Sequence, residues 1–161
     1  MRMHEAVFSV LAVVLFLTGC LRSEAGPSAC DGLSEKTLGI TRDDYSDCAG
    51  EILAEIDGLG LHLERLVRQD DKESLPEARK HNARLRHLMD EVGFQADVYR
   101  DMGSRELALR WPDSSMRSFN VSAMSAATQF AATLVYPNDD NLRQGENHYE
   151  KARQAYSQFR K

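Results

Sequence analysis

The sequence lacks the short motifs that mark most catalytic and metal-binding sites. It has no His-x-x-x-His or His-Glu-x-x-His pair, no Gly-x-Ser-x-Gly elbow and no glycine-rich loop of the kind that cradles phosphate. Zinc proteases, serine hydrolases and nucleotide-binding enzymes depend on these motifs for their geometry, so their absence argues against all three classes. Glu-x-x-His, the metal pattern of di-iron bundles, is missing too. We expect a non-catalytic protein without a resident metal or cofactor.

Basic runs and prolines are also scarce. The formal net charge is −5 and no lysine- and arginine-rich run occurs, so nucleic acid is not an expected partner. Four prolines are too few for a long disordered tail, and an apolar content of 42% is ordinary for a globular domain. No Cys-x-x-Cys-His is present, which argues against covalently attached haem. The composition therefore indicates one globular domain.

The chain has a single long apolar run, from Ala6 to Leu17, behind a short segment that contains Arg2 and Glu5. A run of this length is too short to span a membrane, but it suits the hydrophobic region of an export signal. It ends at Leu17-Thr18-Gly19-Cys20, which resembles the lipobox of bacterial lipoproteins.

This resemblance implies that the signal is cut before Cys20, which then carries a diacylglycerol and an N-acyl chain. One acyl chain binds a membrane only marginally, whereas two or three hold essentially permanently. Leu21 stands where an inner-membrane retention signal has aspartate, so the outer membrane is favoured over the inner one. An ordinary secretory signal and an uncleaved anchor are the alternatives, and the mature chain is exported in every case.

The expected organisation is a signal peptide over 1–19, a lipidated tether over 20–29 and a helical domain over 30–161. With Cys20 assigned to lipid, Cys30 and Cys48 form an even pair in a compartment where disulfides persist. A disulfide there would stabilise the fold by ~3 kcal/mol in the chain-entropy model. Two free thiols or a two-ligand metal site are the alternatives.

Apolar residues recur at spacings of three and four in four segments, which predicts amphipathic helices. These segments run over about 43–69, 74–102, 113–135 and 140–159. Four helices with mostly short connections predict an all-α fold, specifically an antiparallel four-helix bundle with a short disulfide-closed N-terminal lead-in. Gly58 and Gly60, within the first helix, mark close packing or a bend.

Local signals set the expected helix ends. Ser74 and Glu77 form a capping box before the second helix, and Gly103 suits the position after its end. Asp113 reads as the N-cap of the third helix. Between them, 103–112 alternates briefly and predicts a strand-like or single-turn segment, with Leu107, Leu109 and Trp111 folded over the bundle end. The buried arc of the second helix is expected to extend to Ala96 and Tyr99.

Two polar groups fall near the expected core. His81 lies at the edge of an apolar arc, where a structural histidine is favoured over a metal ligand. Asn120 points inward on the third helix, and a buried amide without partners costs ~1–3 kcal/mol. We therefore expect Asn120 to be hydrogen-bonded to the backbone of 103–112, to a water or to a polar side chain such as His81. The alternative is that Asn120 lies close enough to the bundle end to reach solvent.

Two helix faces are candidate partner surfaces. The third helix carries no charge from Ser118 to Tyr136, although a solvent-facing helix normally does, so the lead-in or another protein is expected to cover it. The polar residues of this uncharged face are Ser122, Ser125, Thr128, Gln129 and Thr133. The basic face of the second helix is expected to be a solvated charged surface, with contact to anionic headgroups or an acidic partner as the alternative. Its residues are Arg79, Lys80, Arg84 and Arg86.

Together these patterns predict a non-catalytic, lipid-anchored helical protein on the periplasmic side of the cell envelope. Its expected role is that of an accessory or interaction subunit of an envelope assembly. The alternative is a ligand or metal carrier that uses the bundle core as its site.

Overall fold

The computed structural model describes residues 27–36, 38–93 and 103–160, and over these residues the protein is all-helical. The predicted fold class is therefore confirmed. The elements, in chain order, are η1 (Leu33–Glu35), α2 (Arg42–Arg68), η2 (Lys72–Ser74), α3 (Leu75–Glu91), α5 (Ser104–Arg110), α6 (Ser114–Val135) and α7 (Asp139–Phe159).

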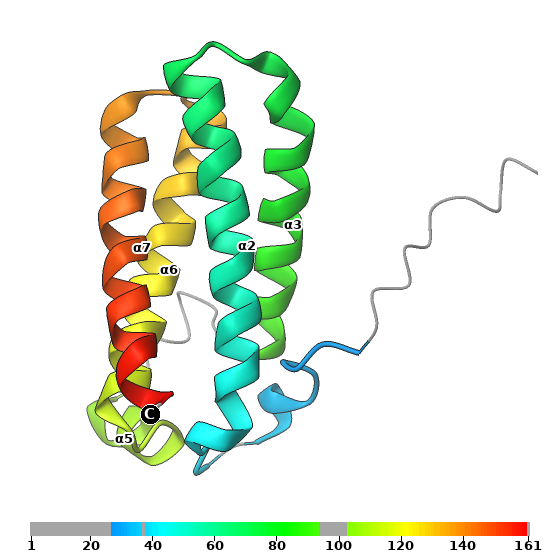
Figure 1. The fold of residues 1–161 in the computed structure, drawn as a ribbon. Helices are drawn as coiled ribbons and strands as arrows, with labels where there is room; N and C mark the ends of the chain where they lie inside the picture. Colours follow the sequence, from blue (N-terminus) through cyan, green and yellow to red (C-terminus); the bar gives the residue numbers. More distant parts are fainter. Residues whose placement is uncertain (1–26, 37, 94–102, 161) are drawn as a thin grey trace, which may run out of the picture.

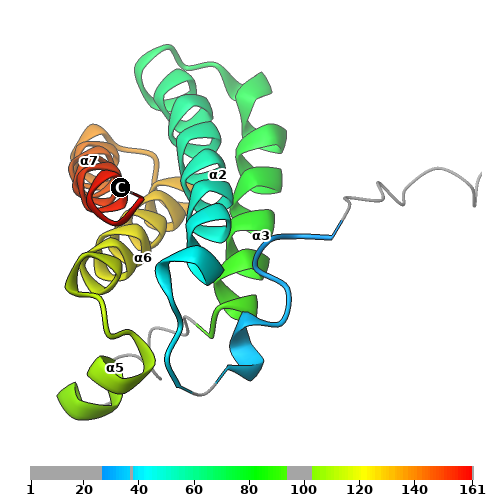
Figure 2. The same ribbon diagram turned by 60° about the horizontal axis from the view of Figure 1, so that its bottom comes forward.

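The four long helices α2, α3, α6 and α7 lie side by side, and α5 lies at one end of them (Figure 1). The short connections from α2 to α3 and from α6 to α7 both lie at the opposite end. α2 contacts the other three long helices, and α6 and α7 share the most extensive contact. Figure 2 shows η1 and α5 at the same end of the molecule.

α2 follows the sequence prediction closely. Its N-cap is Thr41, whose hydroxyl accepts from the Asp44 N–H at 3.2 Å while the Asp44 carboxylate accepts from the Thr41 N–H at 3.1 Å. This reciprocal pair satisfies two backbone donors that a helix start leaves open. Helical spacing of its apolar residues predicts an inner face of seven residues, of which Leu66 is only partly buried. The other six are fully buried, namely Tyr45, Cys48, Ile52, Ile56, Leu59 and Leu63.

The start of α3 differs from the prediction. Ser74 already has helical torsion angles (φ −72°, ψ −16°) and makes no capping hydrogen bond, so the predicted capping box with Glu77 is wrong. Instead, Asp71 accepts from the Glu73 N–H at 3.1 Å and from the Ser74 hydroxyl at 2.7 Å. The cap therefore lies one turn earlier, and η2 winds directly into α3.

The end of α3 also differs. The helix stops at Glu91, because Gly93 adopts a left-handed φ of 74°, which glycine reaches without strain. The prediction that it continues to about Met102 is therefore wrong. The expected core positions Ala96 and Tyr99 lie outside the described residues.

The segment 103–112 forms a helix, α5, rather than the strand-like or single-turn segment predicted. Gly103 is its N-cap, not the residue that follows the second helix. Trp111 is buried and Leu107 is partly buried, as expected, but Leu109 is half exposed, so its predicted place over the bundle end is wrong. The Leu109 carbonyl accepts from the Gly39 N–H at 3.0 Å.

α6 and α7 begin and end almost where the sequence predicts. Asp113 caps α6 by accepting from the backbone N–H groups of Ser115 and Met116. Phe130 of α6 packs into a notch between two glycines. A Cβ atom added at Gly145 of α7 would lie 2.3 Å from the Phe130 ring, and one added at Gly60 of α2 would lie 3.1 Å from it. Gly60 therefore marks close packing.

Candidate functional site

A disulfide joins Cys30 and Cys48, as the sequence predicts, and both residues are fully buried. The Glu51 carboxylate accepts hydrogen bonds from the Ser28 hydroxyl at 2.7 Å and from the Ala29 N–H at 2.9 Å. The lead-in is therefore held on α2 both covalently and through Glu51. This bond removes the two alternatives of free thiols and a two-ligand metal site.

The predicted signal peptide, Cys20 and the tether up to residue 26 lie outside the described residues. Among the helices that are described, none combines the length and the apolar character needed to cross a bilayer. The lipidation of Cys20 therefore stays a prediction.

A polar cluster lies where α2 meets α3, and sequence analysis missed most of it. The Glu55 carboxylate contacts His81 Nδ1 at 2.7 Å and Arg84 Nε at 2.8 Å. The His81 ring stacks on His62 with 5.6 Å between centroids. His81 sits over Gly58, where an added Cβ atom would lie 2.5 Å from the ring, so this glycine also marks close packing.

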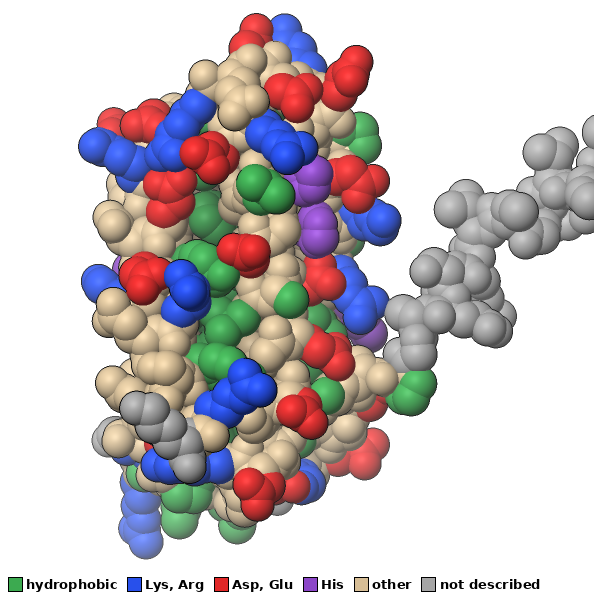
Figure 3. Space-filling view, in the orientation of Figure 1, with side chains coloured by type: hydrophobic (Ala, Val, Ile, Leu, Met, Phe, Trp, Pro, Cys, Tyr) green, Lys and Arg blue, Asp and Glu red, His purple; other side chains and the backbone are tan. Residues whose placement is uncertain are grey.

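The cluster has the chemistry of a half-exposed ion pair. In the space-filling view, histidine side chains gather over the seam between α2 and α3 (Figure 3). No group of three or more metal-binding side chains is found among the described residues. The cluster joins two helices, and no motif in the sequence pairs Gly58 or Glu55 with His81 of the next helix.

Asn120 is fully buried and hydrogen-bonded, as predicted, and its partner is a polar side chain, although that of Tyr45 and not of His81. The Tyr45 hydroxyl donates to Asn120 Oδ1 at 2.8 Å. Among the residues that the structure describes, the Asn120 amide nitrogen has no hydrogen-bond partner. The Tyr45 ring packs against Trp111, with 4.8 Å between centroids, and against Phe119 at 5.9 Å.

The uncharged face predicted on α6 is not one surface. Thr133 is fully buried and donates to the Gln129 carbonyl at 2.9 Å, so its place on a partner surface is wrong. Thr128 is exposed, and its hydroxyl donates to the Met124 carbonyl. Ser122, Ser125 and Gln129 are half-buried. Of the five residues predicted for this face, Thr128 is the one that is fully exposed.

The basic face predicted on α3 is partly neutralised. Arg84 contacts Glu55, and Lys80 lies 3.5 Å from Glu77 one turn away. Arg79 and Arg86 are exposed, and no ion pair of either is found within the described part of the chain. Within the described residues, the guanidinium groups of Arg79 and Arg86 are thus without an ion pair and could face an anionic surface.

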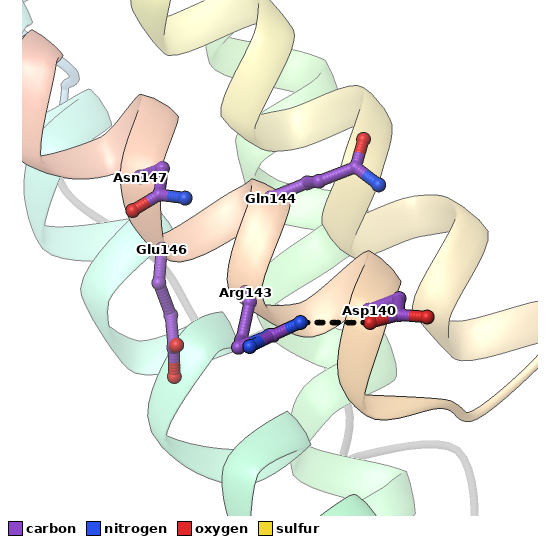
Figure 4. A pocket seen from close by; sticks show the side chains of 5 residues that line it. All are labelled: Asp140, Arg143, Gln144, Glu146 and Asn147. Atoms are coloured by element: carbon purple, nitrogen blue, oxygen red, sulfur yellow. Dashed lines mark hydrogen bonds and ion pairs between the residues drawn. The ribbon is translucent and has the colours of Figure 1, made fainter.

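A shallow hollow of about 590 Å³ lies on α7 (Figure 4). All of its lining residues are polar and come from this one helix, and Arg143 contacts Asp140 across it at 2.9 Å. A hollow lined by one helix without apolar side chains resembles ordinary solvated surface rather than a ligand pocket.

No protein-family model, curated protein or solved structure matches this chain. The assignment of function therefore depends on the residues of the chain itself.

Proposed function

We propose that this chain is a non-catalytic, lipid-anchored protein of the cell envelope. It faces the periplasm, is held by acyl chains on Cys20, and serves as an accessory or interaction subunit of an envelope assembly. The outer membrane is its proposed site. The finer architecture that we propose is an antiparallel four-helix bundle, which is supported by the two short connections at the same end of the molecule.

The observation that carries the proposal is the buried disulfide in a chain that begins with a lipobox-like signal. Cys30 and Cys48 are both fully buried and bonded. Structural disulfides persist in exported proteins and are rare where glutathione keeps thiols reduced. The bond therefore supports the same compartment as Leu17-Thr18-Gly19-Cys20.

The carrier alternative has less support. Aromatic rings fill the interior between α2, α6 and α7, where Phe130 is 1% exposed and Tyr45 is fully buried. A ligand in the core would have to displace these rings, which makes surface interaction the better use of this fold.

Metabolic labelling with palmitate in a bacterial host that processes lipoproteins tests the proposal. The parent chain is expected to incorporate label and to remain with membranes after a high-salt wash. Cys20→Ala is expected to lose the label and accumulate as an unprocessed precursor. Equal labelling of parent and variant would refute lipidation.

Density-gradient separation of the membranes tests the site. The parent chain is expected in the outer-membrane fraction, and Leu21→Asp is expected to move it to the inner one. A parent chain found only in the inner-membrane fraction would contradict the outer-membrane assignment while leaving lipidation intact.

A further inference from the structure

A groove of about 220 Å³ lies between α2 and α7. Figure 3 shows hydrophobic side chains along the seam between these helices, with acidic side chains on both sides. The floor residues are Ile56, Gly60 and Phe130, and Leu61 lies at the edge. The rim carries three carboxylates, from Asp57, Glu64 and Glu146, and the phenol of Tyr149. None of the motifs in the sequence pointed to this combination.

The floor is fixed by packing that glycine makes possible. Phe130 reaches the groove from α6 because Gly60 and Gly145 leave room for its ring. Phe130 is 1% exposed and Ile56 is fully buried, so both are held rigidly by the core. Leu61, by contrast, is 48% exposed at the edge. Leu61 therefore extends the apolar lining of the groove to its edge.

The rim has more negative charge than its own cations neutralise. Arg68 lies 2.9 Å from Glu64 and 3.0 Å from Glu146, and it also contacts Asp139. The single positive charge of Arg68 is thus shared among three carboxylates and neutralises them only in part. No cationic side chain contacts Asp57 within the described residues, and this carboxylate instead accepts from the Tyr149 hydroxyl at 2.8 Å.

The Tyr149 side chain contributes a hydrogen-bond donor and an aromatic ring to the rim of the groove. Burial, together with the hydrogen bond to Asp57, raises the pKa of Tyr149 well above its ordinary value, so the phenol stays neutral and keeps donating. The Arg153 guanidinium carbon lies over this ring at 5.9 Å from its centroid. The ring therefore already attracts a cation through its electron-rich face.

We propose that this groove binds one arginine or lysine side chain presented by a partner protein. The volume is below the ~300–1,000 Å³ of pockets that enclose a whole small ligand, but it suits a single long side chain. The methylene stem would lie along Leu61, above the buried Phe130 ring, and the cationic head would reach Asp57. Long basic side chains contact interfaces in this way, with an apolar stem and a charged head. This inference rests on the proposed role as an interaction subunit and names the chemistry of its partner.

Titration of the full mature chain with two matched peptides tests the groove. One is acetyl-Ala-Leu-Arg-Leu-Ala-amide, and the other replaces arginine with citrulline, which has almost the same shape but no charge. Binding is followed through the backbone amide resonances of Gly60, Leu61 and Tyr149. The arginine peptide is expected to bind about ten-fold more tightly, equivalent to ~1.4 kcal/mol.

The charge of the rim is tested with a double variant, Asp57→Asn/Glu146→Gln, in which the two peptides are expected to bind equally weakly. The matched control Asp47→Asn/Asp140→Asn removes two exposed carboxylates from the same two helices. It is expected to keep the ten-fold preference. Circular dichroism verifies that both double variants are folded.

Equal affinity of the two peptides for the parent chain would overturn the inference. So would resonance shifts that map to α3 and leave Gly60, Leu61 and Tyr149 unmoved. Shifts that depend on protein concentration without peptide would identify a second copy as the occupant and would also overturn it. None of these outcomes bears on the labelling of Cys20, so failure of this inference is distinguishable from failure of the proposed lipid anchor.

Discussion

The Tyr45 hydroxyl donates a 2.8 Å hydrogen bond to Asn120 Oδ1 and so links α2 to α6 through the core. Both residues are fully buried among aromatic rings. A buried polar pair is satisfied only when its two helices are correctly aligned along their length, whereas apolar contacts tolerate small shifts. This bond therefore specifies the register between α2 and α6.

Asn120→Leu is expected to lower the free energy of unfolding by about 1–2 kcal/mol, because it removes this bond. A double-mutant cycle with Tyr45→Phe isolates the pair, and its coupling free energy is expected near 1 kcal/mol. Chemical denaturation measures both values. Ser118→Leu, at an exposed position of α6, serves as the control. A parent-like stability of Asn120→Leu would contradict a structural role for the amide.

The disulfide is expected to contribute about 3 kcal/mol to stability, because its two cysteines are 18 residues apart. Denaturation of the parent chain with and without a thiol reductant measures this difference. In the double variant Cys30→Ala/Cys48→Ala, which has no bond to reduce, the reductant is expected to have no effect. Alkylation without reductant is expected to leave both cysteines of the parent unmodified.

Gly145→Ala is expected to destabilise the fold by about 1–3 kcal/mol, because the new Cβ atom would overlap the Phe130 ring. Phe130→Leu in the same chain is expected to recover part of this loss, since the smaller side chain makes room for the methyl group. Thermal unfolding of the two single variants and the double variant measures the recovery. Additive losses would show that the ring and the glycine are not coupled.

Stability is expected to fall in acid as Asp113 is protonated. Partial burial raises the pKa of Asp113, but hydrogen bonds from Ser115, Arg42 and Met116 outweigh it and lower the pKa from 3.8 to about 2. A depressed pKa contributes stability that is present above the unfolded value and is lost as pH falls through the folded one. The relevant window is therefore from about pH 4 down to about pH 2.

Across this window the parent chain is expected to lose roughly 1–2 kcal/mol more than Asp113→Asn, which cannot titrate. Urea denaturation at several pH values measures the difference. Asp47→Asn, at an exposed position of α2, is expected to follow the parent curve. Parallel curves for the parent and Asp113→Asn would contradict this contribution.

The sequence was sufficient to predict features that depend only on residues close together in the chain. The inner face of α2 was predicted because its apolar residues recur at helical spacing, and the disulfide because one cysteine pair remained after Cys20. Asp113 was recognised as a cap because its short carboxylate precedes an apolar run. In each case the signal is local, so no knowledge of neighbouring helices was needed.

Prediction failed where neighbouring groups compete. Ser74 fits the capping pattern, but its hydroxyl donates a hydrogen bond to the Asp71 carboxylate. Asp71 therefore takes the capping role, and the helical segment begins earlier, with η2. Thr133 looks polar, yet its hydroxyl bonds to the Gln129 carbonyl, which lets the side chain enter the core. The groove was beyond sequence reasoning, because its floor and rim come from α2, α6 and α7, and their pairing is a property of the folded chain.

The disulfide also determines where a mechanical force would travel. If the chain is held at its N-terminal end, tension reaches Cys30 and passes through the sulfur bridge directly into α2 at Cys48. The 17 residues between the two cysteines, which include η1 and the Thr41 cap, would carry none of this tension. Force applied at the anchor would thus act on α2 at Cys48, where the helix is held by its contacts with α3, α6 and α7. The first turn of α2 would carry no tension and would not unwind.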